Sequence, residues 1–394
     1  MKKFLILFSL ILSLTIPHWG CGMFGGGGQP PGTDPNPGDP NFEILQIFWN
    51  VIDLGFFPNR IKTNGTFAYI VNSGSNNIQR VNLINGESNF PWAILPVNSN
   101  PWDITFSGNK AYVSNFVTNT VSVFNLSFGG PPMNTILPNA FGGLVTPEGM
   151  AASSNGFVFV ANPNLDFSGG QTNYGPGFIT VIDTNLDIIV NEIPTTQQNP
   201  QFIHAIGNTV YVTNSGEFQF SSGCNCFVPQ TDGGIDIIDA TQADVLNAPS
   251  DNIPIPLDGA FPFRGIPGSF APTLDNNFAY LGSNSGIIYK VDLLNQTLVR
   301  GNSNPIFVTA DEHDNLINVK SDPEGIIWVL SFNEDLAYLL NFNTDEIDPN
   351  AISLNSDANN LEGPLDIGFL ESGDFPDAYI LMSLSRELSA VITN

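Results

Sequence analysis

Apolar and polar positions alternate with a period of two along most of the chain, in short runs separated by turn residues. The stretch "AYIVNSGSNNIQRVNLING" at 68–86 is followed by a near copy, "AYVSNFVTNTVSVFNLSFG", at 111–129. In each copy an aromatic residue and β-branched residues precede an Asn, a polar turn and a second apolar run. A period of two predicts strands, because a helical solenoid would repeat its apolar positions every 3.6 residues.

The aromatic residue of this motif recurs at intervals of 43 to 69 residues. Its copies are Tyr69, Tyr112, Phe159, Tyr211, Tyr280, Trp328 and Tyr379. Repeats of this length, each with room for four short strands, are typical of β-propeller blades. A proline precedes most of the aromatics by 11 to 15 residues, where it fits the first residue of a strand. We therefore predict an all-β, seven-bladed β-propeller over residues 42–394.

The N-terminal and C-terminal segments of this region are complementary in their number of strands. After Pro364 the sequence holds three strand-like segments, one fewer than a complete blade needs. The segment "FEILQIFWNVIDLG" at 42–55 is strand-like and belongs to no later repeat. We expect it to pair outside the C-terminal strand, because this closes the ring and covers an exposed sheet edge.

Two repeats also carry a family resemblance. The segment "YVTN" at 211–214 is followed by "GGIDIIDATQ", and "FVANPN" at 159–164 is followed by "FITVIDTNLDIIVNEIP". These repeats resemble the YVTN-repeat β-propeller proteins of bacterial envelopes. The resemblance implies a propeller from about residue 42 to the end of the chain. It implies less about activity, because this repeat occurs in lipoproteins, surface-layer proteins and lactonase-like enzymes.

Residues 1–20 have the form of a signal peptide, with Lys2 and Lys3 before a short apolar run. The run closes at Gly20 and Cys21, which resembles a bacterial lipoprotein signal whose Cys21 becomes the lipidated N-terminus. An ordinary secretory peptide is the alternative. Residues 21–41 are rich in Gly and Pro and predict a flexible linker. We expect a protein anchored by lipid to the outer membrane or cell surface, or a periplasmic protein if Cys21 carries no lipid.

Charge narrows the range of partners. The chain has 37 acidic and 11 basic residues, for a net charge of -26. Such a surface repels phosphate backbones and argues against a nucleic-acid partner. We expect a monomer that binds a protein, a glycan or a small ligand.

The expected binding site lies at the channel mouth of the propeller. In an up-and-down meander the D–A and B–C loops share one face, so the residues after each blade-opening proline should ring the mouth. Long B–C insertions at 163–177 and 215–234 open onto the same face. The binding candidates are Arg60, Trp102, Asp103, Glu148, Gln201 and Asp366, with Asn59 and Leu365 beside them and Asp314 at a similar offset in blade six. Ordinary turn and capping roles are the alternative for these residues.

Three of these candidates allow a second function. Asp103, Glu148 and Asp366 are hard oxygen ligands of the kind that bind Ca²⁺, so a metal-dependent hydrolase of the lactonase kind is the alternative to a binding scaffold. With only three histidines and no C-x-x-C-H motif, the sequence argues against histidine-rich metal clusters and attached haem. We assign no catalytic residue and favour binding.

The second long insertion contains Cys224 and Cys226 with one residue between them. In an oxidising compartment this pair predicts a local disulfide. A thiolate metal site is less compatible with the sequence, because it would need two further soft ligands and none is nearby.

Overall fold

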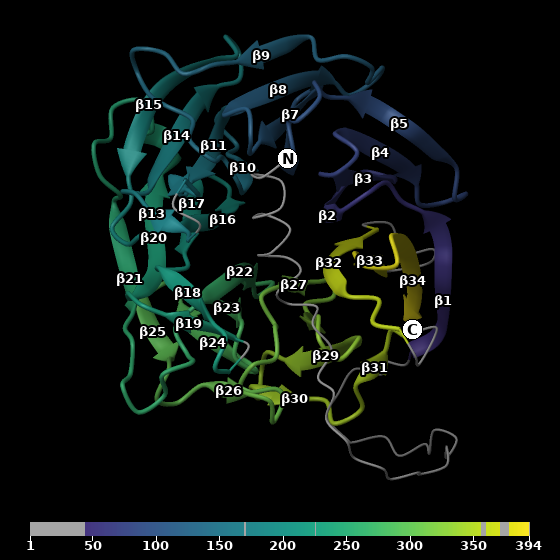
Figure 1. Cartoon of the computed structure of the whole chain (residues 1–394), viewed down its shortest axis with the longest axis vertical. Coiled ribbons are helices and arrows are strands. Elements are labelled where there is room, and N and C mark those ends of the chain that lie inside the picture. The colour runs from purple at the N-terminus through teal and green to yellow at the C-terminus, as the bar shows by residue number, and fades with distance from the viewer. Residues whose placement is uncertain (1–43, 169–170, 225, 356–359, 371–377, 394) are drawn as a thin grey trace.

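The structure is a computed structural model that describes all residues except 1–43, 169–170, 225, 356–359, 371–377 and 394. Seven antiparallel sheets stand around a central axis as the blades of a propeller (Figure 1). The predicted all-β, seven-bladed fold is confirmed. In blades 1 to 6 the strands of the main sheet follow one another in chain order from the centre of the ring outward.

The blades succeed one another in chain order. Blade 1 contains β2 (Pro58–Asn64), β3 (Phe67–Asn72), β4 (Asn77–Asn82) and β5 (Ser88–Ile94). Blade 2 contains β6 (Pro101–Ser107), β7 (Lys110–Asn115), β8 (Thr120–Asn125) and β9 (Asn134–Ile136). Blade 3 contains β10 (Met150–Ala152), β11 (Phe157–Asn162), β14 (Phe178–Asp183) and β15 (Ile188–Pro194). Blade 4 contains β16 (Pro200–Ile206), β17 (Thr209–Asn214), β20 (Gly233–Asp239) and β21 (Asp251–Ile255).

The remaining blades are less regular at their outer edges. Blade 5 contains β22 (Pro267–Pro272), β23 (Phe278–Ser283), β24 (Ile287–Asp292) and β25 (Thr297–Arg300), with β26 (Ile306–Phe307) beside β24. Blade 6 contains β27 (Val319–Ser321), β28 (Ile327–Ser331), β29 (Leu336–Asn341) and β30 (Glu346–Ile347), with β31 (Ile352–Ser353) beside β29. Blade 7 contains β32 (Pro364–Phe369), β33 (Ala378–Met382), β34 (Glu387–Thr393) and β1 (Ile44–Asp53).

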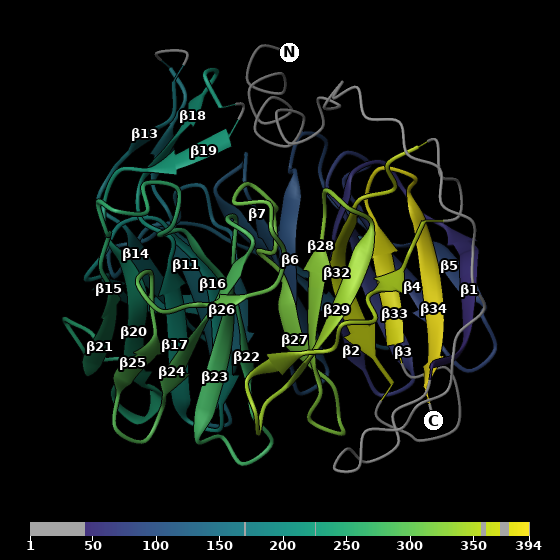
Figure 2. The same cartoon turned by 90° about the horizontal axis from the view of Figure 1, so that it is seen from below.

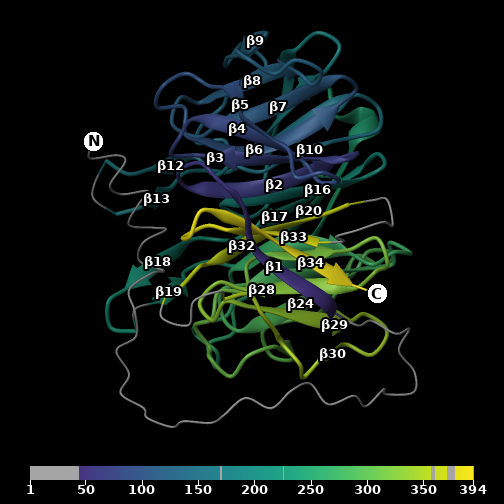
Figure 3. The same cartoon turned by 90° about the vertical axis from the view of Figure 1, so that its right-hand side faces the viewer.

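Blade 7 joins the two ends of the described chain. Strand β1 pairs antiparallel with β34, with Ile47 opposite Val391 and Asp53 opposite Glu387 (Figure 3). The N-terminal segment therefore supplies the fourth strand of the last blade, as its sequence predicts. This pairing covers the edge that β34 would otherwise expose to other chains.

The innermost strand begins with its proline in five blades, at Pro58, Pro101, Pro200, Pro267 and Pro364. In all five the pairing with the next strand is irregular directly after the proline, which marks a β-bulge. A proline fits there because its missing N–H removes no ladder hydrogen bond. The bulge breaks the regular alternation of side chains at one end of every such strand.

Blades 3 and 6 depart from this rule. In blade 3 strand β10 begins at Met150, three residues after Pro147. In blade 6 the expected offset of Asp314 is wrong, because Asp314 lies before the strand and accepts a hydrogen bond from the hydroxyl of Ser331. The backbone N–H of Leu330 donates to Asn318 O. Leu330 is the counterpart of Val71 in blade 1, because each is the last residue but one of the second strand. Val71 lies opposite Arg60 in the register, so Asn318 occupies in blade 6 the position that Arg60 has in blade 1.

The core consists of hydrophobic clusters between neighbouring blades. Between blades 1 and 2, for example, Tyr69 and Val71 pack with Ile104 and Val113. The motif aromatics lie in these clusters, and several also bridge blades by hydrogen bonds. The Tyr112 hydroxyl donates to Asp187 of blade 3 at 2.6 Å. Burial and inter-blade bonding explain why the sequence repeats an aromatic at this place.

Helix is almost absent from the described residues, where the secondary structure includes one 3₁₀ turn at Ala240–Gln242. No helix in that part of the chain is both long and apolar enough to span a membrane. The proposed signal peptide, Cys21 and the linker to residue 41 lie outside the described residues.

Candidate binding site at the centre of the ring

The two long B–C insertions form hairpins that rise together from one face of the ring (Figure 2). The first consists of β12 (Leu165–Asp166) and β13 (Asn173–Tyr174), and the second of β18 (Phe218–Ser221) and β19 (Cys226–Pro229). The Tyr174 hydroxyl donates to the Phe218 carbonyl at 3.0 Å, and the two rings are 5.8 Å apart. The hairpins therefore support each other rather than standing alone.

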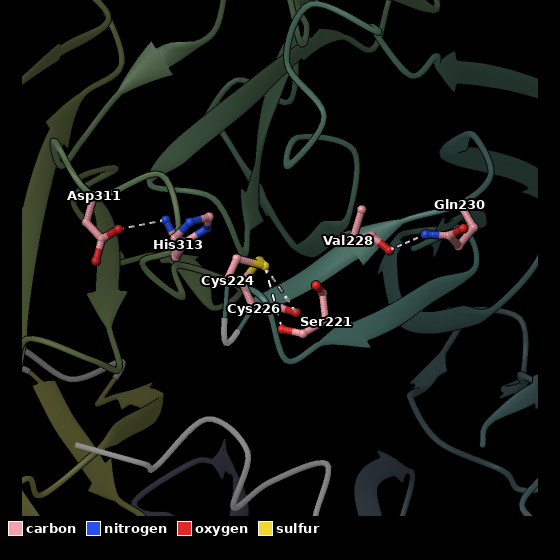
Figure 4. The surroundings of a disulfide bond; sticks show 7 residues. All are labelled: Ser221, Cys224, Cys226, Val228, Gln230, Asp311 and His313. Atoms are coloured by element: carbon pink, nitrogen blue, oxygen red, sulfur yellow. Dashed lines mark hydrogen bonds between the residues drawn. A yellow bond between two sulfur atoms is a disulfide. The ribbon is translucent and has the colours of Figure 1, made fainter. Parts of the chain in front are cut away.

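A disulfide joins Cys224 and Cys226 at the end of the second hairpin (Figure 4). The rings of Phe218 and Phe220 both pack edge-on against Phe227 on the opposite strand. A two-stranded hairpin is marginal by itself, so the aromatic contacts and the covalent link both help to hold it above the blade.

The same face carries the starts of the innermost strands. The backbone N–H of Phe116, in a B–C loop, donates to Asn100 O directly before β6. In blade 4 the N–H of Ser215 likewise donates to Asn199 O before β16. The residues one, two and four positions after the opening proline, or at the matching register in blade 6, are grouped as three layers. The first layer is Asn59, Trp102, Glu148, Gln201 and Leu365; the second includes Arg60, Asp103, Phe202, Asn318 and Asp366; the third includes Lys62, His204 and Lys320.

Asp103 and Asp366 connect neighbouring blades. Asp103 of blade 2 accepts hydrogen bonds from the N–H of Ile104 and from the N–H of Met150 in blade 3, each at 2.8 Å. Its carboxylate also pairs with Lys62 at 2.9 Å. Both carboxylate oxygens of Asp103 are thus occupied by protein donors.

Asp366 repeats the arrangement between blades 7 and 1. It accepts from the N–H of Ile367 at 2.9 Å and from the N–H of Ile61 at 3.0 Å. Lys320 lies 3.7 Å from the same carboxylate. Two aspartates at equivalent positions therefore perform the same structural task on opposite sides of blade 1.

Arg60 reaches across the centre of the ring. Its guanidinium lies 5.0 Å from the ring centre of Phe202 in blade 4 and 3.4 Å from Asn318 Oδ1 in blade 6. The side chain is 9 % exposed, yet among the described residues no carboxylate lies within ion-pair distance of it. Buried arginines usually have an anionic partner, so this cation is under-compensated.

The third layer adds two more cations. Lys62 Nζ donates to Met150 O at 2.8 Å, and Lys320 Nζ donates to Ile367 O at 2.5 Å. Desolvation, then the charges of Lys62 and Lys320, lower the pKa of His204 to about 4, so this histidine is neutral at pH 7. Desolvation also lowers the pKa of Lys320, and nearby Lys62 and Arg60 act in the same direction, while Asp366 opposes them. Arg60 and Lys62 of blade 1 therefore lie close enough to Lys320 of blade 6 to affect its pKa.

Glu148 differs from the two aspartates. It is 2 % exposed, and its Oε2 is buried without a hydrogen-bond partner in the described structure. Burial raises the pKa of Glu148 to about 8, while the charge of Arg60 and the amide of Gln201 oppose that rise. The carboxyl group is therefore mostly protonated at pH 7 and can donate a hydrogen bond.

Trp102 and Asn59 complete the first layer with further unpaired groups. The Asn59 amide donates to Trp102 O at 2.8 Å, but its own Oδ1 is buried without a partner. The indole Nε1 of Trp102 is also buried and unpaired among the described residues. The Trp102 ring stacks on Phe116 at 5.3 Å, and Phe116 contacts Phe167 of the first hairpin at 6.2 Å. The unpaired atoms of Asn59 and Trp102 therefore lie beside an aromatic wall formed by Trp102, Phe116 and Phe167.

Three of the predicted binding residues interact with one another. Glu148 interacts electrostatically with Arg60 and forms a hydrogen bond with the Gln201 side chain. Ser215 Oγ donates to Gln201 Oε1 at 2.7 Å. Leu365 instead packs against the hydrophobic cluster between blades 7 and 1.

The three carboxylates expected to hold Ca²⁺ are not gathered for that purpose. The described residues contain no group of three or more His, Cys, Asp or Glu side chains placed to hold a metal ion. Asp103 and Asp366 are instead bonded to backbone N–H groups and lysines.

Sequence reasoning missed Phe202, Asn318, Lys62 and Lys320. A signal for two of them exists in the repeat, because Lys62 lies opposite Tyr69 and Lys320 opposite Trp328 in the strand register. The residue that pairs with the motif aromatic is therefore the third-layer position in each of these blades. A cavity of about 320 Å³ lies elsewhere, lined by residues 256–259, 298–299 and 301–304, and includes none of the three layers.

Comparison with known proteins supports the fold. A chain of hydrazine synthase from Kuenenia stuttgartiensis superposes with a TM-score of 0.66 at 14% identity, covering 87% of this chain and 97% of that one. A streptogramin B lyase gives 0.61 at 14% identity, covering 90% and 98%. Virginiamycin B lyase from Staphylococcus aureus gives 0.60 at 14% identity, covering 89% and 99%. At this identity the likeness shows the propeller fold alone.

No family model matches the sequence, and no curated protein matches it. The resemblance to the YVTN-repeat proteins therefore stays a prediction beyond the propeller fold itself.

Proposed function

We propose that this chain is an exported lipoprotein of the bacterial envelope whose propeller binds a small ligand at the centre of the ring. The observation that carries the binding site is the set of buried, unpaired polar atoms there: Glu148 Oε2, Trp102 Nε1 and Asn59 Oδ1. Leaving such groups unpaired costs free energy, and a bound ligand can supply the missing partners. The paired hairpins of blades 3 and 4 lie on the same face as this site, and Phe167 of the first hairpin contacts Phe116 beside Trp102.

Tethering through Cys21 is tested by fractionation of cells. We expect Cys21→Ser to move the protein from the membrane fraction to the soluble fraction, because the lipid would be its main attachment. A Cys21→Ser protein that stays with the membrane after washing in high salt would contradict lipid anchoring.

Ligand binding is tested with a panel of small organic acids and amides, oligosaccharides, peptidoglycan fragments and short peptides. We expect Trp102→Ala to weaken binding of any retained compound at least tenfold, because the indole supplies both an aromatic surface and a free donor. Phe128→Ala is the matched control, since Phe128 is an exposed aromatic of the same blade in the turn after β8. Equal binding by wild type and Trp102→Ala would place the ligand elsewhere.

The hydrolase alternative has no supporting observation of its own. It requires a metal, and the carboxylates that were expected to bind one are engaged by protein donors in two cases out of three.

A further inference from the structure

We infer that the ligand site at the ring centre recognises a small oxyanion, with a carboxylate or phosphoryl group held by Arg60 and with Lys62 and Lys320 beneath it. This inference rests on the proposed function, because it names the chemistry of a ligand at the same site.

The first step is the contrast between the centre and the rest of the molecule. The whole chain carries a net charge of -26, yet three of its 11 basic residues belong to the inner strands β2 and β27. The side chains of Lys62 and Lys320 keep 28% and 35% exposure, although desolvation lowers the pKa of Lys320. A cationic centre inside an acidic protein is an arrangement that selects for an anion small enough to enter.

The second step is the pairing of charges. Lys62 has Asp103 at 2.9 Å and Lys320 has Asp366 at 3.7 Å, which leaves Arg60 as the third cation. Its described hydrogen bonds go to neutral acceptors, at 3.5 Å to Asn59 O and 3.4 Å to Asn318 Oδ1. Both distances are at the long end for hydrogen bonds, so the guanidinium is held in place but poorly satisfied.

The third step is the geometry of donors. The guanidinium carbon of Arg60 lies 5.0 Å from the ring centre of Phe202, and this cation–π contact helps to hold the cation at the centre of the ring. A planar guanidinium matches the two oxygens of a carboxylate or phosphate, so an oxyanion is the ligand that satisfies it best. The free donor Nε1 of Trp102 lies in the layer directly above.

The fourth step concerns the nearby acid. An ionised Glu148 would repel an anion from Arg60. Burial keeps Glu148 mostly protonated at pH 7, so it adds a donor rather than a negative charge.

The experiment uses the full chain carrying Cys21→Ser, at pH 6.5 and constant ionic strength. Calorimetric titration and thermal unfolding are measured with succinate, and with succinamide as a probe of similar size without charge. Phosphate and sulfate form a second pair of probes. We expect saturable binding and a rise in Tm with at least one oxyanion, and none with succinamide, because a ligand that binds the folded state stabilises it. The succinate and phosphate arms distinguish a carboxylate from a phosphoryl ligand.

Arg60→Met should weaken oxyanion binding at least tenfold, and Arg60→Lys should weaken it less because it keeps the charge but loses the planar pair of donors. Arg80→Met is the matched control: Arg80 belongs to the same blade and also lies over an aromatic ring, that of Phe67 at 4.6 Å, but it lies outside the three layers. Equal loss in Arg80→Met, or unchanged binding in Arg60→Met, would overturn the inference. If Arg60→Met fails to fold, the comparison of succinate with succinamide on the parent protein still decides.

The two proposals can fail separately. A ligand whose binding depends on Trp102 but survives in Arg60→Met would leave the proposed function standing and refute the oxyanion. Binding of oxyanions that depends on Arg60 but not on Trp102 would support the inference and remove the aromatic wall from the site.

Discussion

Asp103 and Glu148 lie in neighbouring blades at the same end of the ring, but their surroundings are opposite. Asp103 is surrounded by donors: two backbone N–H groups and the ammonium of Lys62. Glu148 is equally buried and has an oxygen without a hydrogen-bond partner among the described residues. Buried acids in this ring therefore serve two purposes: Asp103 joins neighbouring blades, whereas Glu148 keeps an oxygen available for a ligand.

The aspartate side of this comparison predicts the largest effect. Asp103→Ala removes the acceptor of the Met150 N–H and the carboxylate partner of Lys62, so we expect the free energy of unfolding to fall by about 3–5 kcal/mol. Urea denaturation measures this loss. Asp244→Ala, at an exposed aspartate, is the control and should change stability by less than about 0.5 kcal/mol. A loss below about 1 kcal/mol for Asp103→Ala would show that this carboxylate does not join the blades.

The glutamate side predicts a smaller effect that depends on pH. Because the folded-state pKa of Glu148 is about 8, raised from 4.5, its stabilising contribution is complete below pH 4.5 and is lost as the pH rises through 8. In the Glu148→Gln variant the side chain at this position is an amide and does not titrate. We therefore expect the variant to gain stability relative to wild type between pH 5 and pH 9, by up to about 4 kcal/mol at roughly 1.36 kcal/mol per unit of pKa difference.

Denaturation at several pH values measures this difference between the two proteins. Other buried acids contribute equally to the stability of both proteins, so their effects cancel in this difference. One of them is Asp314, whose pKa burial raises to about 7. Tyr174 interacts electrostatically with Glu148, and burial raises the pKa of Tyr174 further above its usual value, so this tyrosine does not titrate in the measured range. A difference that stays flat with pH would mean that Glu148 is ionised throughout.

The sequence predicts the ring well and its centre poorly, for a physical reason. Strand alternation, the blade-opening prolines and the spare strand at β1 are local patterns, and local patterns can be read one blade at a time. The pairing of Arg60 with Asn318 joins residues 258 positions apart, and nothing in either blade announces it. Asp103 and Asp366 lie on the innermost strands β6 and β32, and their acceptor role depends on N–H groups of the next blade.

The smallest expected effect concerns calcium, and it sharpens the contrast between the two kinds of acid. Because Asp103 and Asp366 are bonded to N–H groups and lysines, a cation would have to displace Lys62 or Lys320 to reach them. Glu148 alone offers one oxygen and is protonated at pH 7. We therefore expect 5 mM calcium chloride to change Tm by less than about 1 °C relative to magnesium or sodium chloride of equal ionic strength, since a ligand without a site shifts no folding equilibrium. Differential scanning calorimetry with and without chelator makes the measurement. A saturable rise of several degrees that Asp103→Asn abolishes would mean that the lysines yield to a metal, and that Asp103 belongs with Glu148 after all.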